Sequence, residues 1–70
     1  MAAVPETFPE RLKWLRKKRG VSQRVLSELC GMNKNQIARF ERGEREPRLQ
    51  DLIALSDYFG VSIDYLACNK

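Results

Sequence analysis

Residues 21–47, VSQRVLSELCGMNKNQIARFERGEREP, constrain the fold more than any other part of the chain, because they encode two short amphipathic helices joined by a tight turn. Ser22 provides a start signal for the first helix, since its hydroxyl can accept a hydrogen bond from a free backbone N–H, and Gly31 ends it. The second helix is predicted over 33–42; its first residue, an asparagine, is another good N-cap, and Gly43 terminates it. The apolar positions at helical spacing are Leu26, Leu29, Cys30, Ile37 and Phe40.

So short a link forces the two helices to cross at a steep angle, which demands a small residue where they touch. Ser27, four residues before Gly31, is that residue, and Ile37 and Phe40 follow the glycine by six and nine positions. A small residue, a glycine and two apolar residues at these spacings are a specific signal for two crossed helices.

Three further helices are predicted from their start and stop signals. Pro9 suits the first turn of a helix that is ended by Gly20. A fourth helix is expected to begin at 46–47 and to stop at Gly60, and Ser62 caps a short fifth one, IDYLA. The predicted core positions of these helices and their linker are Phe8, Leu12, Leu15, Leu49, Leu52, Ile53, Leu55, Ser56, Phe59, Val61, Ile63 and Leu66.

These signals predict an all-α fold, a compact bundle of five short helices around one core. Seventy residues make one domain, close to the lower limit at which a chain without disulfides or a metal buries enough apolar surface. We divide the chain into a loose N-terminal arm (1–7), a helical domain (8–67) and a C-terminal tail (68–70). Cys30 and Cys68 are predicted to be free thiols, because their positions do not suggest a disulfide framework.

Positive charge is concentrated in one part of the chain. Residues 11–48 hold twelve of the thirteen basic side chains and four of the nine acidic ones, a net of +8, whereas the remainder is acidic apart from Lys70. Concentrated positive charge on a small domain is typical of a polyanionic partner, and phosphate neutralisation supplies most of the sequence-independent affinity for DNA. The alternative is a solvated basic face without a partner.

Other functional classes are disfavoured by what the sequence lacks. No stretch approaches the ~18 apolar residues of a membrane span, and MAAVPETFPE has neither the basic start nor the apolar run of a signal peptide, so we expect a cytoplasmic protein without membrane contacts. The chain has no histidine and no Gly-rich phosphate loop after a strand, and its two cysteines are too far apart for a zinc site. We therefore expect no enzymatic activity, no metal and no cofactor.

Several motifs across residues 8–67 belong to one pattern. They are Leu15-Arg16, Ser22-Gln23, Leu26-Ser27-Glu28-Leu29-Cys30-Gly31, Ile37-Ala38-Arg39-Phe40-Glu41-Arg42-Gly43, Pro47, Leu49, Leu52, Gly60-Val61-Ser62 and Leu66. In these motifs the chain resembles the phage-repressor type of helix-turn-helix domain, the Cro and repressor class often called Xre. The resemblance implies a lambda-repressor-like fold in which the third helix lies in the major groove of double-stranded DNA and a symmetric dimer reads two half-sites about one DNA turn apart.

The resemblance also implies which side chains reach DNA. The residues placed at base edges are Lys34, Asn35, Gln36, Ala38 and Arg39. Lysine and arginine can donate to guanine O6 and N7, asparagine and glutamine can bond adenine, and the alanine methyl group can contact thymine. The residues placed at phosphates are Gln23, Asn33, Arg42, Arg45 and Arg48. Alternatives remain: the third helix simply has an exposed polar face, Arg45 and Arg48 pair with Glu44 or Glu46, or Arg48 approaches the minor groove.

One pair of charged residues has a structural role by the same resemblance. Family members pair an arginine of the first helix with a glutamate of the third near the core, and Arg16 and Glu41 occupy these positions. A bidentate pair there would lock the third helix to the rest of the domain.

Two features depart from the family pattern. Trp14 lies on the side of its helix away from Leu12, where the family usually has a polar residue, and Val25 and Leu29 form an apolar i, i+4 pair. An exposed apolar patch can mark a partner surface. The interpretation we favour is that these apolar side chains pack against the N-terminal arm, at Val4 or Pro5.

Together these features predict a sequence-specific DNA-binding transcriptional regulator, a repressor that binds a two-fold symmetric operator as a homodimer. The dimer is expected to be weak and to form through the fifth helix and residues 65–70, since contact there would set two reading helices about one DNA turn apart. The alternatives are an antitoxin or operon autoregulator that also binds a partner protein, and a protein-interaction module that has lost DNA binding.

Overall fold

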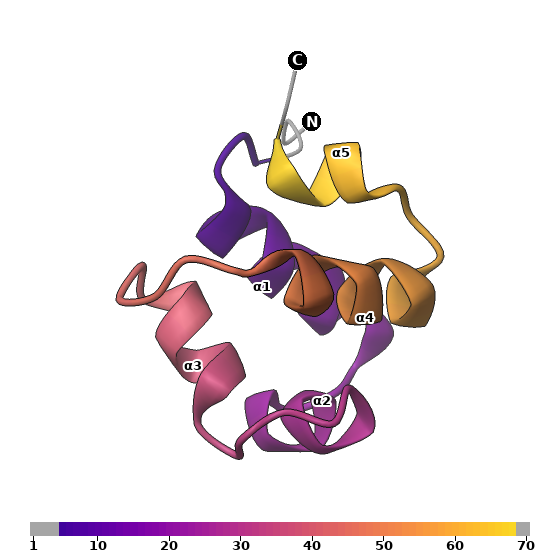
Figure 1. Cartoon of the computed structure of the whole chain (residues 1–70). Helices are drawn as coiled ribbons and strands as arrows, with labels where there is room; N and C mark the ends of the chain where they lie inside the picture. The colour runs from indigo at the N-terminus through magenta and orange to yellow at the C-terminus, as the bar shows by residue number, and fades with distance from the viewer. Residues whose placement is uncertain (1–4, 69–70) are drawn as a thin grey trace.

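Five helices form the computed structural model, which describes residues 5–68 (Figure 1). They are α1 (Phe8–Arg19), α2 (Gln23–Leu29), α3 (Gln36–Glu41), α4 (Leu49–Phe59) and α5 (Ile63–Ala67). The predicted all-α fold of five short helices is confirmed. Val4 of the predicted arm and residues 69–70 of the predicted tail lie outside the described residues.

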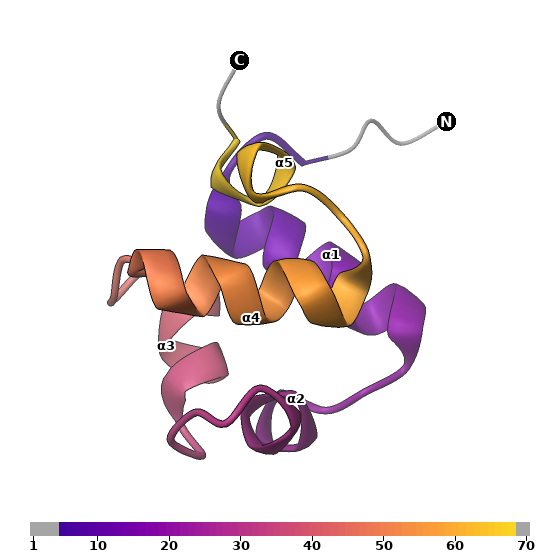
Figure 2. The same ribbon diagram turned by 45° about the vertical axis from the view of Figure 1, so that its right-hand side comes forward.

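The helices α1 and α4 cross the middle of the molecule, with α2 and α3 on one side of them and α5 on the other (Figures 1 and 2). Helix α1 packs against α3 and α5, α2 packs against α3, and α4 packs against α5. Across residues 5–68 no helix has the length and apolar character needed to cross a membrane.

Every helix contributes to a single core. Its fully or nearly buried apolar residues are Leu12, Leu26, Ile37, Phe40, Leu55, Phe59 and Leu66. The ring of Phe8 meets that of Phe40 edge to face at 5.6 Å between centroids, which joins the start of α1 to the end of α3. The core therefore ties the α2–α3 pair to the rest of the domain.

Two predicted core positions are wrong. Leu49 and Ile53 of α4 are 66% and 44% exposed. The physical reason is that α4 is covered along one side only, where Leu55 and Phe59 are buried. Leu29, an apolar residue at helical spacing on α2, is 59% exposed, because the buried residues of α2 are Leu26 and Ser27 on another side of the helix.

The predicted helix ends are right for α1, α2 and α5. The hydroxyl oxygens of Ser22 and Ser62 accept hydrogen bonds from the backbone N–H groups of the third residue after each, at 3.1 and 3.0 Å. Gly31, in the turn after α2, has φ +69°, a left-handed conformation that glycine adopts without steric cost. Cys30 is half-buried beside the core, and this burial raises the pKa of its thiol.

The predicted starts of α3 and α4 are both too early. Asn33 does not cap α3; its Oδ1 accepts the N–H of Asn35 at 3.0 Å and so closes a local turn before the helix begins at Gln36. Helix α4 begins at Leu49 instead of at residues 46–47. Its start is fixed by Asp51, whose Oδ2 accepts the backbone N–H of Arg48 at 2.9 Å.

Candidate nucleic-acid interface

The orientation of α3 is set from beneath by α2. Ser27 is completely buried, and its Oγ accepts the backbone N–H of Ile37 at 3.3 Å. Because no side chain at the start of α3 caps it, this bond from α2 satisfies one of the free N–H groups of its first turn. The serine is therefore small enough for the close crossing and also supplies a cap from the neighbouring helix.

A buried polar network fixes the other end of α3. Arg16 donates from Nε to Glu41 Oε2 at 2.6 Å and from Nη2 to Glu41 Oε1 at 3.0 Å, and the two side chains are only 11% and 4% exposed. Arg16 Nη1 also donates to the carbonyl oxygen of Val21 at 2.9 Å. The bidentate pair thus holds α3 against α1 and against the linker to α2.

Gln23 belongs to this network as well. Its Nε2 donates to Glu41 Oε1 at 3.0 Å, so the side chain placed at a phosphate by resemblance is anchored to the end of α3. An amide NH₂ group carries two donor hydrogens, which leaves one for a further acceptor. A substitution at Gln23 will therefore disturb Glu41 as well as any contact that Gln23 makes outside the protein.

The side of α3 that does not pack against α1 and α2 is polar and accessible. Lys34, Asn35 and Arg39 are exposed, whereas Gln36 and Ala38 are half-buried. All five residues placed at base edges thus lie on α3 or on the turn that leads into it, and three of them are open to solvent. The side chains offer ammonium, amide and guanidinium donors together with amide acceptors.

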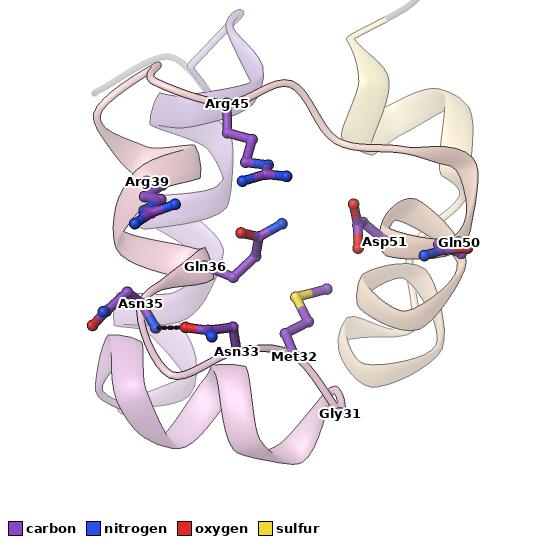
Figure 3. Close-up of a pocket in the computed structure, with 9 residues that line it drawn as sticks. All are labelled: Gly31, Met32, Asn33, Asn35, Gln36, Arg39, Arg45, Gln50 and Asp51. Carbon is purple, nitrogen blue, oxygen red and sulfur yellow. Dashed lines mark hydrogen bonds between the residues drawn. The ribbon is translucent and has the colours of Figure 1, made fainter.

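A hollow of about 470 Å³ lies next to this polar side (Figure 3). One wall comes from Gln36 and Arg39 of α3, the floor from the turn at residues 31–33, and the far wall from Gln50 and Asp51 in the first turn of α4. Arg45 extends into it from the turn between α3 and α4. The surface beside α3 is therefore concave and carries both positive and negative side chains.

Sequence reasoning missed Gln50 and Asp51 because it placed the start of α4 too early. The available signal was the acidic residue three positions after Arg48, since an acidic side chain at that place can accept the N–H group at the helix start.

Sequence reasoning also missed Arg11, which donates from Nε to the carbonyl oxygen of Pro5 and from Nη1 to that of Tyr65. No local pattern marks such a bridge between the two ends of the domain.

The arginines that follow α3 differ in their partners. Arg42 forms an exposed bidentate pair with Glu44, at 2.6 and 3.2 Å, and the hydrogen bond from Arg42 lowers the pKa of the Glu44 carboxyl. Within the part of the chain that the structure describes, Arg45 and Arg48 have no carboxylate within 4.0 Å. The pairing of Arg45 or Arg48 with Glu44 or Glu46 that the sequence allowed is not found.

Trp14 and the Val25–Leu29 pair, which depart from the family pattern, have different surroundings. Lys18 lies over the half-buried ring of Trp14, with Nζ 4.4 Å from the ring centroid. Val25 and Leu29 are 43% and 59% exposed on α2. The carbonyl oxygen of Pro5, in the described part of the arm, is held by Arg11.

A protein-family model described as Helix-turn-helix matches residues 12–66. The chain belongs to the helix-turn-helix family. The match runs from the middle of α1 to α5, so it includes both crossed helices and the helices that support them.

Named relatives in this family are regulators. The SPbeta prophage-derived uncharacterized HTH-type transcriptional regulator YonR of Bacillus subtilis is 39% identical over 59 residues, which are 84% of this chain and 55% of that protein. Repressor protein C2 of Salmonella phage P22 is 39% identical over 57 residues, which are 81% of this chain and 26% of that protein. The helix-turn-helix chain thus spans about half the length of the first relative and about a quarter of the second.

Two solved structures share the helix arrangement. The P22 c2 repressor protein, crystallised in complex with synthetic operator 9T in the presence of Tl⁺, matches with a TM-score of 0.82 and 35% identity, covering 89% of this chain and 94% of that chain. The restriction-modification controller protein C.AhdI from Aeromonas hydrophila matches with a TM-score of 0.77 and 30% identity, covering 84% and 89%. The predicted repressor-type helix-turn-helix fold is confirmed.

Proposed function

We propose that this chain binds double-stranded DNA in a sequence-specific manner and acts as a transcriptional repressor, with α3 in the major groove. The observation that carries the proposal is the opposite character of the two sides of α3. Arg39 of α3 is exposed, as are Lys34 and Asn35 of the turn before it, while Glu41 at the end of the helix is held by Arg16 in a buried pair. A rigidly held helix with exposed donors meets the requirements for reading base edges.

The likeness to the P22 c2 repressor supports this proposal, because that protein was crystallised on a synthetic operator. The names of the relatives support a role in transcription, and Repressor protein C2 supports repression as the direction. In this arrangement Lys34, Asn35 and Arg39 make base contacts, with Gln36 and Ala38 beside them.

Phosphate contacts are proposed at the edges of the same surface. Gln23 offers its second amide hydrogen, and Asn33 lies on the turn before α3. Arg48 has no carboxylate partner among residues 5–68, and Arg42 can exchange the exposed Glu44 for a phosphate. Such contacts set the register of the protein on the duplex and carry no direct sequence information.

A homodimer is proposed because one reading helix of six residues contacts few base pairs. Specific sites are typically bound at ~10⁻⁸ M or tighter at physiological salt, which requires two such helices acting together. Helix α5 is short, so the dimer is expected to be weak in solution and to assemble on a two-fold symmetric operator.

A binding titration at increasing salt tests DNA binding directly. Wild-type protein is titrated against a duplex selected from a random pool and against a scrambled duplex of the same composition, with fluorescence anisotropy as the readout. We expect the logarithm of affinity to fall linearly with the logarithm of salt concentration for both duplexes, and the selected one to bind at least ~10³ times more tightly at physiological salt. Binding to neither duplex at low salt would contradict the proposal and favour a protein-interaction module.

A further inference from the structure

We propose that Arg45 determines specificity by reading a guanine edge, together with the side chains of α3. The inference rests on the proposed DNA-binding function and concerns the same surface. It changes the phosphate role that the resemblance implies for Arg45, and three observations carry it.

The first observation is where the side chain lies. Arg45 is outside α3, in the turn before α4, yet it lines the same hollow as Gln36 and Arg39. Figure 3 shows its guanidinium group extending over the hollow toward the amide of Gln36. A base edge that contacts the side of α3 facing the major groove would therefore lie within reach of Arg45 as well.

The second observation is that the guanidinium N–H groups of Arg45 make no hydrogen bond to the protein within residues 5–68. Arg42, three residues earlier, uses its guanidinium in a bidentate pair with Glu44. Over residues 5–68, Arg45 has neither a carboxylate within 4.0 Å nor a side-chain hydrogen bond to a protein acceptor. A planar guanidinium with free donors fits the two acceptors of guanine, O6 and N7.

The third observation is the charge of the opposite wall. Asp51 faces the hollow from the first turn of α4 and is held there because its Oδ2 accepts the N–H of Arg48. A carboxylate repels phosphate oxygens, so this hollow is a poor phosphate site. A G·C pair presents guanine acceptors and a cytosine N4 amino donor, which suits a hollow with both an arginine and a carboxylate.

Arg48 provides the matched comparison. It is also exposed and also without a carboxylate partner in the described part of the chain, but it is not among the residues that line the hollow. If lining the hollow is what gives Arg45 its role, the two arginines will have different effects on sequence preference when they are removed.

The test is a parallel selection from one random duplex pool with wild type, Arg45→Ala, Arg45→Lys and Arg48→Ala, each first checked for unchanged thermal unfolding. We expect wild type to enrich a motif with a guanine that both Arg45 variants no longer require, with discrimination at that position falling at least about fivefold. Lysine keeps the charge but lacks the planar fork, so it separates recognition from charge. Arg48→Ala should keep the full motif and bind all sequences more weakly.

The outcomes separate this inference from the function on which it rests. If wild type enriches a motif and Arg45→Ala enriches the same motif with uniformly weaker binding, Arg45 is a phosphate contact and the inference is overturned while DNA recognition stands. If wild type enriches no motif, sequence-specific DNA binding itself is contradicted, and the role of Arg45 falls with it.

Discussion

At the scale of single residues, the Arg16–Glu41 pair joins stability to the position of α3. Arg16→Met should lower the free energy of unfolding by ~3–5 kcal/mol, because it leaves the nearly buried Glu41 carboxylate with Gln23 as its remaining described side-chain donor. Chemical denaturation measures this loss. The matched control is Arg24→Met, which breaks the exposed pair with Glu28 and should cost less than about 1 kcal/mol. Equal small losses in both variants would show that the buried pair does not hold α3.

Arg39 tests base reading on α3 itself. Because Arg39 is exposed, Arg39→Ala should leave folding unchanged, yet it should lower specific affinity by ~1–3 kcal/mol and relax discrimination at one base position per half-site. The measurement is a titration against a series of single base-pair variants of the selected duplex. If the variant discriminates among them as wild type does, Arg39 does not read a base.

At the scale of elements, the crossing of α2 and α3 depends on one hydroxyl group. Ser27→Ala keeps the small size that the crossing needs but removes the acceptor for the buried N–H of Ile37, which should cost ~1–3 kcal/mol of stability. Denaturation gives the loss, and hydrogen exchange locates it, since the amide of Ile37 should exchange faster. An unchanged exchange rate at Ile37 would mean that this bond does not support α3.

The existence of the elements and the starts of α1, α2 and α5 could be predicted from local signals, whereas the start of α3 could not. Ser22, Ser62 and the glycines mark helix ends through short-range chemistry that is visible in the sequence. Asn33 carries the same kind of signal but uses it in a turn before α3, because Ser27 already caps that helix from α2. A contact across the fold thus decided the boundary.

The candidate site was also predictable only in part from the sequence. The residues of α3 follow from the motif, but the hollow depends on how α3, its following turn and the start of α4 come together in space. No local sequence pattern therefore marks Gln50 or Asp51 as part of the site. Asp51 is marked only as an acidic residue that can accept the N–H group at the start of α4. The amphipathic pattern also overestimated the core, since Leu49 and Ile53 of α4 recur at helical spacing but are exposed.

At the scale of the whole molecule, the proposed dimer depends on α5. Arg11 lies 4.4 Å from the ring centroid of Tyr65 and donates to its backbone carbonyl, so α5 is fixed to α1 and to Pro5. Tyr65→Glu keeps an attractive partner for Arg11, and we expect near-native thermal stability but loss of cooperative two-to-one binding on a palindromic duplex. Native stoichiometry and cooperativity in this variant would place the interface elsewhere, with Trp14, Val25 and Leu29 as the next residues to test.

Methylation interference on the selected duplex shows whether α3 reads the major groove of DNA in two half-sites, because guanine N7 lies in the major groove and adenine N3 in the minor groove. We expect methylation at guanine N7 to block binding in two clusters about one DNA turn apart. Interference only by methylation at adenine N3, or none at either position, would mean that α3 does not read the major groove.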